Sequence, residues 1–429
     1  MEFLKIMYRN FNSSHRKKAV AENFLSLSVL QVTSFLVPLI TMPYLFRVLG
    51  PSKCGLIAFA SAFVQYFAAI IEYGFGLSAT REIAINQNDP HKVSEIFCSV
   101  LIIKIFFFCI SALFFLTLLL AVPRFRNDWV VFLITFCGLI GNVLLPVYFF
   151  QGMDKMRYYL LSSLTVLATT AAIFFFIKAE KDYLNLPLIN ACGAIASGVI
   201  AVAVVLFRFN VRVVFPSKGQ LKRQLIEGWH VFVANLSSSV PANTRVFVVG
   251  IFASDTITGY YSAAERLITM LFAFPLSVLA QSVVSKLSAL FITDELLVRK
   301  LLKKLQWFTS LMYLTIVAVF FPLAPAIMTF FCGKPFPEAV LSFRLLLIPL
   351  LLAAYNAFRL QSFFIYGKSS IFAHVCLVAG IAGTASCFIL AFLFSYVGAA
   401  VSLIILVVVM IWMSVKNEAL LITQSAAKA

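Results

Sequence analysis

Apolar windows of about 20 residues recur along almost the whole chain, and a helix of that length crosses the hydrocarbon core of a bilayer. Short polar or charged segments separate the windows. We predict twelve spans, near residues 21–45, 54–76, 96–121, 129–150, 158–177, 186–207, 226–252, 257–286, 307–331, 340–365, 371–394 and 397–415. No connecting segment exceeds about 20 residues, so no room remains for a separate catalytic domain. The pattern predicts an all-α integral membrane protein.

A basic segment, residues 208–225, marks the middle of the chain between the sixth and seventh predicted spans. It separates two sets of six spans, 21–207 and 226–415. Segment 1–20 precedes the first set and segment 416–429 follows the second. Paired halves of this kind are common in transporters. We therefore predict an N-terminal and a C-terminal six-helix bundle.

The composition supports the membrane class. Of the 429 residues, 62% are hydrophobic and 12% are charged, whereas a soluble domain is about half apolar and about a quarter charged. Water-soluble enzymes, DNA-binding domains and disordered proteins are excluded. The eight cysteines are scattered, mostly within apolar runs and without a C-x-x-C pair. We expect them to be small buried side chains and expect no metal site or disulfide framework.

The net charge of +17 is explained by topology. If both termini are cytoplasmic, the cytoplasmic segments carry 22 Lys and Arg residues, and the opposite loops carry seven. Positive residues concentrate on the cytoplasmic side of membrane proteins. The asymmetry predicts that both ends of the chain are cytoplasmic (N-in, C-in), and it removes any need for a nucleic-acid partner.

Five basic residues remain inside predicted spans, where a charge is costly and usually faces a cavity. They are Lys104, Arg245, Arg266, Arg344 and Arg359. Carboxylates are fewer at this depth, because Glu72 and Glu227 lie near span ends and Glu265 is the one deep inside a span. A cavity lined by these residues favours an anionic ligand. The forked donors of arginine suit phosphate groups.

Helical phase groups some of these residues. At about 100° per residue, the tenth span aligns Arg344, Tyr355 and Arg359 on one face. On the eighth span Glu265 and Arg266 are adjacent, so each needs a different partner or water. We favour a cavity-facing position for both groups.

The seventh span allows two interpretations. Glu227 and Arg245 share one face, and Asn235 and Asn243 lie off that face. These residues could line a cavity. They could equally bind neighbouring helices, with the charges near the ends reaching the membrane surface.

The second and third spans carry weaker signals. Gln65 and Glu72 lie on one face of the second span, where polar residues most often serve helix packing. Lys104 of the third span is near enough to the inner surface to extend its amine into the headgroups, so a cavity position is the less favoured alternative.

The chain lacks the common catalytic motifs. Gly367-Lys368-Ser369 resembles the end of a P-loop, but the required first glycine would fall at Ser362. No H-E-x-x-H or G-x-S-x-G sequence occurs. We expect neither an enzyme nor a cofactor.

Four blocks in a fixed order resemble a known family. They are Pro38–Leu45 continued by Arg47–Pro51 and Gly55-Leu56, then Ala79–Ala84, then Phe149–Gly152 with Asp154–Met156, and finally Tyr260–Arg266. The set is similar to the bacterial flippases of the polysaccharide transport family, which belong to the multidrug/oligosaccharidyl-lipid/polysaccharide (MOP) exporter superfamily. The blocks cover roughly residues 20–290, and the last third of the chain matches in hydropathy alone.

The resemblance implies a fold and a function. The fold is two six-helix bundles around a central cavity that works by alternating access. The function is movement of an undecaprenyl-pyrophosphate-linked oligosaccharide, such as an O-antigen repeat unit, from the cytoplasmic to the periplasmic leaflet of the bacterial inner membrane. A polymerase and a chain-length regulator of the same pathway are the implied partners.

The residue roles follow from helical phase together with this function. Candidates for substrate binding are Arg245, Arg266, Arg344, Arg359 and Lys104 for the pyrophosphate, and Asn235, Asn243, Tyr355 and Gln65 for the sugars. Candidates for a coupling proton or sodium ion are Glu265, Glu227 and Glu72.

Two other functions stay open at this point. A drug/cation antiporter of the same superfamily would need a cavity dominated by carboxylates, and this chain has more arginines than glutamates at depth. A membrane polymerase or glycosyltransferase acting on the same lipid carrier would be expected to have a large outside loop, which the spacing of the spans does not allow.

Overall fold

The computed structural model describes residue 33 and residues 36–291, 294–334, 336–366 and 368–426. Within these ranges every regular element is helical and no strand occurs. A helix over residues 36–48 is followed by α3 (Gly50–Glu72), α4 (Phe75–Ile85), α5 (Pro90–Ala121), α6 (Pro123–Asn127), α7 (Trp129–Cys137), α8 (Leu139–Leu144), α9 (Val147–Gly152), α10 (Arg157–Phe176), the 3-10 helix η1 (Glu180–Leu184), α11 (Asn185–Arg208), α12 (Lys218–Phe252), α13 (Asp255–Phe291), α14 (Glu295–Cys332), α15 (Pro337–Ile365) and α16 (Ser369–Ala426).

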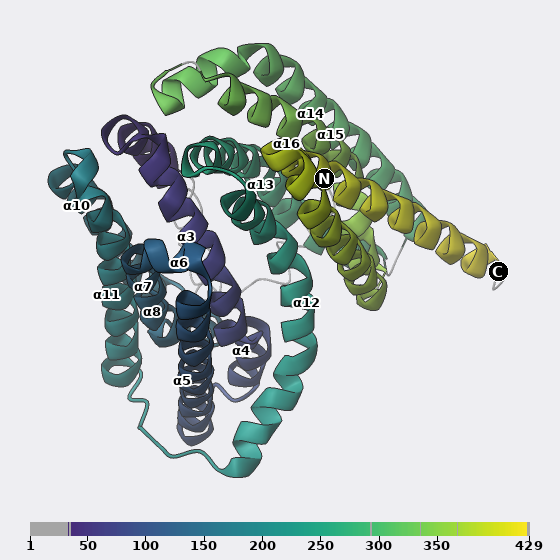
Figure 1. Cartoon of the computed structure of the whole chain (residues 1–429). Coiled ribbons are helices and arrows are strands. Elements are labelled where there is room, and N and C mark those ends of the chain that lie inside the picture. The colour runs from purple at the N-terminus through teal and green to yellow at the C-terminus, as the bar shows by residue number, and fades with distance from the viewer. Residues whose placement is uncertain (1–32, 34–35, 292–293, 335, 367, 427–429) are drawn as a thin grey trace. The chain divides into compact units, whose positions relative to one another are not determined.

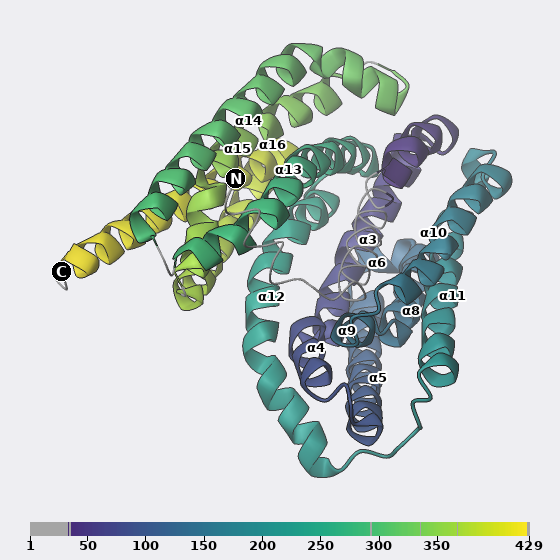
Figure 2. The ribbon, with the colours of Figure 1, turned by 180° about the vertical axis from the view of Figure 1, so that it is seen from behind.

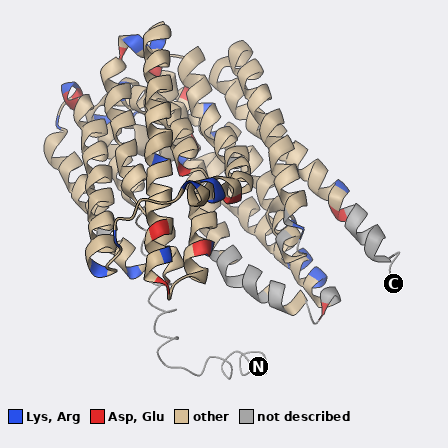
Figure 3. Ribbon diagram, turned by 90° about the horizontal axis from the view of Figure 1, so that it is seen from below, with Lys and Arg blue, Asp and Glu red and all other residues tan. Residues whose placement is uncertain are grey.

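The predicted class, an all-helical membrane protein, is confirmed. Eight helices of the described chain are long and apolar enough to cross a membrane. Figure 3 shows that Lys, Arg, Asp and Glu gather near helix ends and leave long stretches of helix without charge. A bilayer favours this distribution, because a charge at its centre is costly.

The count of eight differs from the twelve predicted spans for identifiable reasons. The first predicted span begins outside the described residues, as does the predicted segment 1–20, and Leu36–Val48 is too short to count. Polar residues lower the hydropathy of α12, and part of α13 lies outside the described side chains. In α16 two helices are joined at Ser395, whose backbone is not helical (φ 53°, ψ −133°). The number twelve stays a prediction.

The described chain forms two compact units. The first contains Phe67–Val233 together with the described residues up to Thr41, and the second contains Met42–Tyr66 and the residues from Ala234 onward. Three helices of the described chain, the one over residues 36–48, α3 and α12, are therefore divided between the units. The predicted bundles, 21–207 and 226–415, stay a prediction.

In the first unit a sharp turn separates α3 from α4. Tyr73 and Gly74 both have positive φ angles, 43° and 82°. A Cβ atom on Gly74 would lie 2.8 Å from the backbone nitrogen of Phe232, so glycine serves both the conformation and the close approach of α12. The ring of Tyr73 stacks on Phe232 with centroids 4.7 Å apart. This turn directs α4 toward α9, and the two helices pack together (Figures 1 and 2).

In the second unit α13, α14, α15 and α16 pack around one apolar core (Figures 1 and 2). The first part of α3 joins them through glycines. A Cβ atom on Gly55 would lie 1.8 Å from the carbonyl oxygen of Asp255, and one on Gly259 would lie 2.1 Å from that of Pro51. The first sequence block therefore meets the start of α13, just before the fourth block, backbone to backbone.

Candidate functional site

In the first unit Lys104 is buried beside a carboxylate. Its side chain is 1% exposed, and its Nζ lies 2.7 Å from Glu72 Oε2 at the end of α3. The amine also lies 3.5 Å from the carbonyl oxygen of Asn142 and 5.6 Å from the centre of the Tyr148 ring. An ammonium group out of water requires such compensation. Lys104 is therefore enclosed and neutralised in this conformation.

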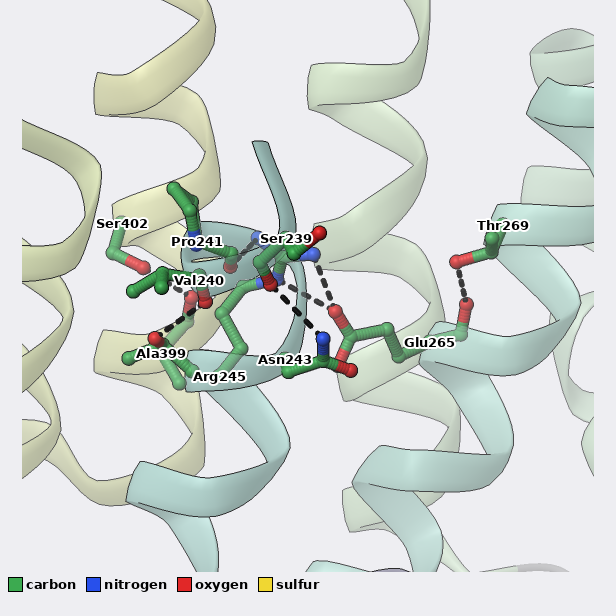
Figure 4. A network of polar contacts seen from close by, with 10 residues as sticks. Ser239, Val240, Pro241, Asn243, Arg245, Glu265, Thr269, Ala399 and Ser402 are labelled. Atoms are coloured by element: carbon green, nitrogen blue, oxygen red, sulfur yellow. Dashed lines mark hydrogen bonds and ion pairs between the residues drawn. The ribbon is translucent and has the colours of Figure 1, made fainter. Parts of the chain in front are cut away.

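In the second unit Arg245 of α12 points at Glu265 of α13 (Figure 4). Its Nε and Nη2 lie 2.7 Å and 2.5 Å from Glu265 Oε1, and its Nη1 donates to the carbonyl oxygen of Pro241 at 3.0 Å. Both side chains are close to 10% exposed, at 11% and 9%. Glu265 Oε2 is buried and has no hydrogen-bond donor within the described chain. This pair joins two predicted site residues from different helices.

A third pair lies between α15 and α16. Arg359 Nε donates to Glu418 Oε2 at 2.7 Å. The guanidinium stacks over the ring of Tyr355, 5.1 Å from its centre, and Nη2 donates to the tyrosine hydroxyl at 3.5 Å. Tyr355 is 40% exposed.

Two predicted arginines have no carboxylate partner in the described part of the chain. Arg266 is exposed on α13, and the described residues give it neither a hydrogen bond nor an ion pair. Arg344 Nε donates to the carbonyl oxygen of Phe321 at 3.3 Å, and its guanidinium lies 5.2 Å from the centre of that ring. These two cations are free to attract an anion.

The remaining predicted residues occupy separate positions. Glu227 accepts from Arg223 Nε at 2.9 Å, one helical turn away. Asn243 Nδ2 donates to the carbonyl oxygen of Ser239 at 2.9 Å (Figure 4). Asn235 and Gln65 are exposed.

Two carboxylates with partners were missed by the sequence analysis. Glu418 falls in the segment predicted as a cytoplasmic tail, whereas residues 416–426 continue α16. Glu82 of α4 is buried and accepts from Gln220 Nε2 at 3.3 Å and from Gln224 Nε2, and Arg223 Nη2 lies 3.6 Å away. Glu82 lies inside the block Ala79–Ala84, which was the available signal.

The arrangement has a clear electrostatic consequence. The carboxylates of Glu72, Glu265 and Glu418 are each held by a cation, while the guanidinium groups of the predicted residues Arg266 and Arg344 lack a carboxylate in the described structure. The described residues contain no group of three or more His, Cys, Asp or Glu side chains that could hold a metal ion. Anion binding is the chemistry best supported by the available groups.

Comparison with known sequences supports the family resemblance. Residues 20–287, more than half of the chain, match the polysaccharide biosynthesis protein family. A proposed O-antigen transporter of Escherichia coli (strain K12) is 29% identical over 416 residues, which cover 95% of this chain and 99% of that protein. A proposed O-antigen transporter of Shigella dysenteriae is 25% identical over 248 residues, which cover 57% of this chain and 62% of that protein.

Solved structures with the same fold are transporters. An inward-facing multidrug resistance MATE family transporter of the MOP superfamily superposes with a TM-score of 0.74 at 16% identity, covering 94% of this chain and 100% of that one. The lipid II flippase MurJ in an inward closed conformation superposes with a TM-score of 0.61 at 12% identity, covering 91% and 87%. The resemblance carried by the four sequence blocks is thus confirmed, and the chain belongs to the polysaccharide biosynthesis protein family, with the fold of these transporters.

Proposed function

We propose that this protein is a flippase for undecaprenyl-pyrophosphate-linked oligosaccharide, an O-antigen or similar repeat unit. It moves the lipid-linked sugar from the cytoplasmic to the periplasmic leaflet of the bacterial inner membrane. Family membership supports this proposal, as does a relative that matches nearly end to end and is named for O-antigen transport.

The observation that carries the proposal is the guanidinium of Arg266, which has no hydrogen bond or ion pair to the described residues. It lies eleven residues after the first residue of α13, about 16 Å along the helix axis. A cation without a counter-ion at this position is costly unless a ligand or water compensates it. A pyrophosphate group supplies the opposite charge and several acceptor oxygens, so the cargo itself is the natural partner.

The other roles are assigned around this residue. Arg344 supports Arg266 in binding pyrophosphate, and Arg245, Arg359 and Lys104 take part when their carboxylates are released. Asn235, Asn243, Tyr355 and Gln65 contact sugars. Glu265, Glu227 and Glu72 are the candidates for carrying a coupling ion, and Glu265 has a buried oxygen without a donor in the described structure.

The proposal includes the topology and the cycle. Twelve helices cross the membrane in two six-helix bundles, both termini are cytoplasmic, and the central cavity opens alternately to the two sides. A polymerase and a chain-length regulator act on the cargo after it has crossed.

The charge arrangement disfavours a drug/cation antiporter. Such a protein needs carboxylates that are free to bind a cation. In the described structure Glu72, Glu265 and Glu418 are each within 2.7 Å of a cationic nitrogen. A membrane polymerase is disfavoured because the relatives with similar sequences are named as transporters.

Replacing Arg266 tests the proposal in cells. We expect Arg266→Ala to reduce surface polysaccharide at least about tenfold, because one charge-assisted contact to phosphate contributes about 1.5–3 kcal/mol. The readout is surface polysaccharide in a strain that lacks the chromosomal gene and carries the variant. Arg126→Ala changes an exposed arginine of α6, outside the predicted spans, and is the matched control. Normal surface polysaccharide with Arg266→Ala, at normal protein level in the membrane, overturns the assignment.

A further inference from the structure

Two polar contacts join the C-terminal part of α15 to the C-terminal part of α16. Besides the Arg359–Glu418 ion pair, Asn356 Nδ2 donates to Ser414 Oγ at 3.3 Å. Asn356 and Ser414 are 1% and 0% exposed. The two contacts are one turn apart on each helix, so they fix the register of α16 on α15 at this end.

The guanidinium of Arg359 has more donors than its partners use. A guanidinium carries five N–H groups. One carboxylate oxygen accepts from Nε, and the Tyr355 hydroxyl lies at the outer limit of a hydrogen bond from Nη2. Nη1 is buried and has no acceptor among the described residues. A ligand with several oxygens in a compact arrangement would satisfy this group better than the single carboxylate does.

The carboxylate in this pair is the more accessible member. Glu418 is 31% exposed and Arg359 is 12% exposed, whereas both members of the Arg245–Glu265 pair are close to 10% exposed. Glu418 also lies eight residues before the last described residue of the chain, Ala426, in the final turns of α16. Lys416 does not compete for it, because its amine lies over the ring of Trp412, 5.4 Å from the centre. Arg359 is thus held by its surroundings, and the Glu418 carboxylate is the group that can move away from the ion pair toward solvent.

We propose that the Glu418 carboxylate occupies the position that the diphosphate group of a lipid takes on Arg359 during the transport cycle. Glu418 is then an intramolecular competitor, which we call the Glu418 latch. Binding of the lipid diphosphate to Arg359 displaces the carboxylate. The contact between the last turns of α16 and α15 is weakened at the same time. This inference rests on the proposed function for the role of Arg359, and it adds Glu418 as the residue that controls access to it.

The latch makes a quantitative prediction for binding. While Glu418 occupies the site on Arg359, the diphosphate cannot bind there. The apparent affinity for diphosphate is therefore the intrinsic affinity multiplied by the fraction of molecules in which the site is open. Removing the negative charge of Glu418 therefore tightens binding, whereas removing a residue that merely holds the helices together does not. This difference in sign separates a latch from a purely structural ion pair.

The test uses the purified full-length protein in detergent and isothermal titration calorimetry with two probes. Inorganic pyrophosphate presents the diphosphate alone, and farnesyl diphosphate presents it on a prenyl lipid. We expect Glu418→Gln to lower the Kd for both probes about tenfold, which corresponds to about 1.4 kcal/mol. The double variant Arg359→Gln/Glu418→Gln should lose this gain. Glu338→Gln, at the opposite end of α15, should bind as the wild type does.

Three results overturn the latch. The first is a Kd of Glu418→Gln and Glu418→Ala that equals or exceeds that of the wild type. The second is equal binding by Glu418→Gln and the double variant. The third is that no variant binds either probe. If Glu418→Gln binds pyrophosphate more tightly than the wild type but does not bind farnesyl diphosphate more tightly, the assignment to a lipid headgroup is overturned. Thermal unfolding in the same detergent confirms that each variant is folded. Transport in cells separates the latch from the proposed function. If the wild type does not transport lipid-linked sugar but Glu418→Gln binds the probes more tightly, the proposed flippase is contradicted and the anion site remains.

Discussion

Charge compensation determines what each basic side chain can do. Lys104, Arg245 and Arg359 each have a carboxylate oxygen within 2.7 Å, so their charges are already neutralised in this conformation. Arg266 has no such partner in the described chain. Because a charge removed from water is stabilised only by a counter-charge or by hydrogen bonds, the first three maintain the structure until their pairs open. Arg266 is therefore the residue that we propose binds the anion first.

Removing the carboxylate of the Arg245–Glu265 pair should destabilise the protein. Glu265→Gln leaves Arg245 buried without its counter-charge, and breaking a buried pair in this way costs about 3–5 kcal/mol. We expect a corresponding fall in the free energy of unfolding, measured by denaturant titration in detergent.

The double variant Arg245→Met/Glu265→Leu is the matched control. It removes both charges, so it should be more stable than Glu265→Gln. Wild-type stability for Glu265→Gln would show that the pair contributes nothing and that Arg245 finds another partner.

The pairing of these residues could not be predicted from one sequence. Helical phase correctly places Tyr355 and Arg359 together, and the two side chains are in contact. Phase also aligns Arg344 with them, yet Arg344 binds Phe321 of α14. The phase of a residue specifies its face on one helix and says nothing of which side chains a neighbouring helix brings to that face. Glu418 lies 59 positions from Arg359 in the sequence.

Close contact between elements depends on glycine. α3 and α13 approach so closely that a methyl group on Gly55 would lie 1.8 Å from a backbone oxygen. Backbone atoms cannot move away without displacing a whole helix. Gly55 and Gly259 are therefore required by packing.

Adding that methyl group should separate the two helices. We expect Gly55→Ala to lower the free energy of unfolding by about 1–3 kcal/mol, the usual cost of overpacking. Gly219→Ala is the matched control, because its Cβ would meet only Ser217 Oγ, at 3.8 Å. That substitution should be neutral or stabilising by up to about 1 kcal/mol. Equal unfolding midpoints for the two variants in a thermal melt would contradict the close packing of α3 on α13.

Hydropathy predicted the elements better than their ends. The predicted spans near 226–252, 257–286 and 307–331 correspond to α12, α13 and α14, but these helices extend beyond the apolar windows. Backbone hydrogen bonding does not depend on whether a residue lies in lipid, so a helix continues where its polarity changes. For the same reason residues 416–426, predicted as a tail, continue α16.

At the scale of the molecule, composition determined the class and a few short blocks determined the family. A chain this apolar is stable in a membrane when helices satisfy its backbone hydrogen bonds. The described chain has eight helices that are long and apolar enough to span one. The four blocks have a structural reason to occur together. The first block meets the start of α13, which leads into the fourth, through Gly55 and Gly259. The second and third blocks meet where Thr80 Oγ1 donates to Gln151 Oε1 at 3.4 Å.

Direct measurement of flipping tests the central claim, that the protein moves a lipid-linked pyrophosphate by means of Arg266. Purified protein is placed in liposomes that contain a fluorescent polyprenyl-pyrophosphate-linked oligosaccharide, and an impermeant quencher reports how much of the lipid reaches the outer leaflet. We predict that wild type and Arg126→Ala expose lipid from both leaflets. With Arg266→Ala, the quencher should reach only the lipid that starts in the outer leaflet, as in protein-free liposomes. Equal flipping by Arg266→Ala and wild type, or no flipping by wild type beyond that of empty liposomes, would contradict the account.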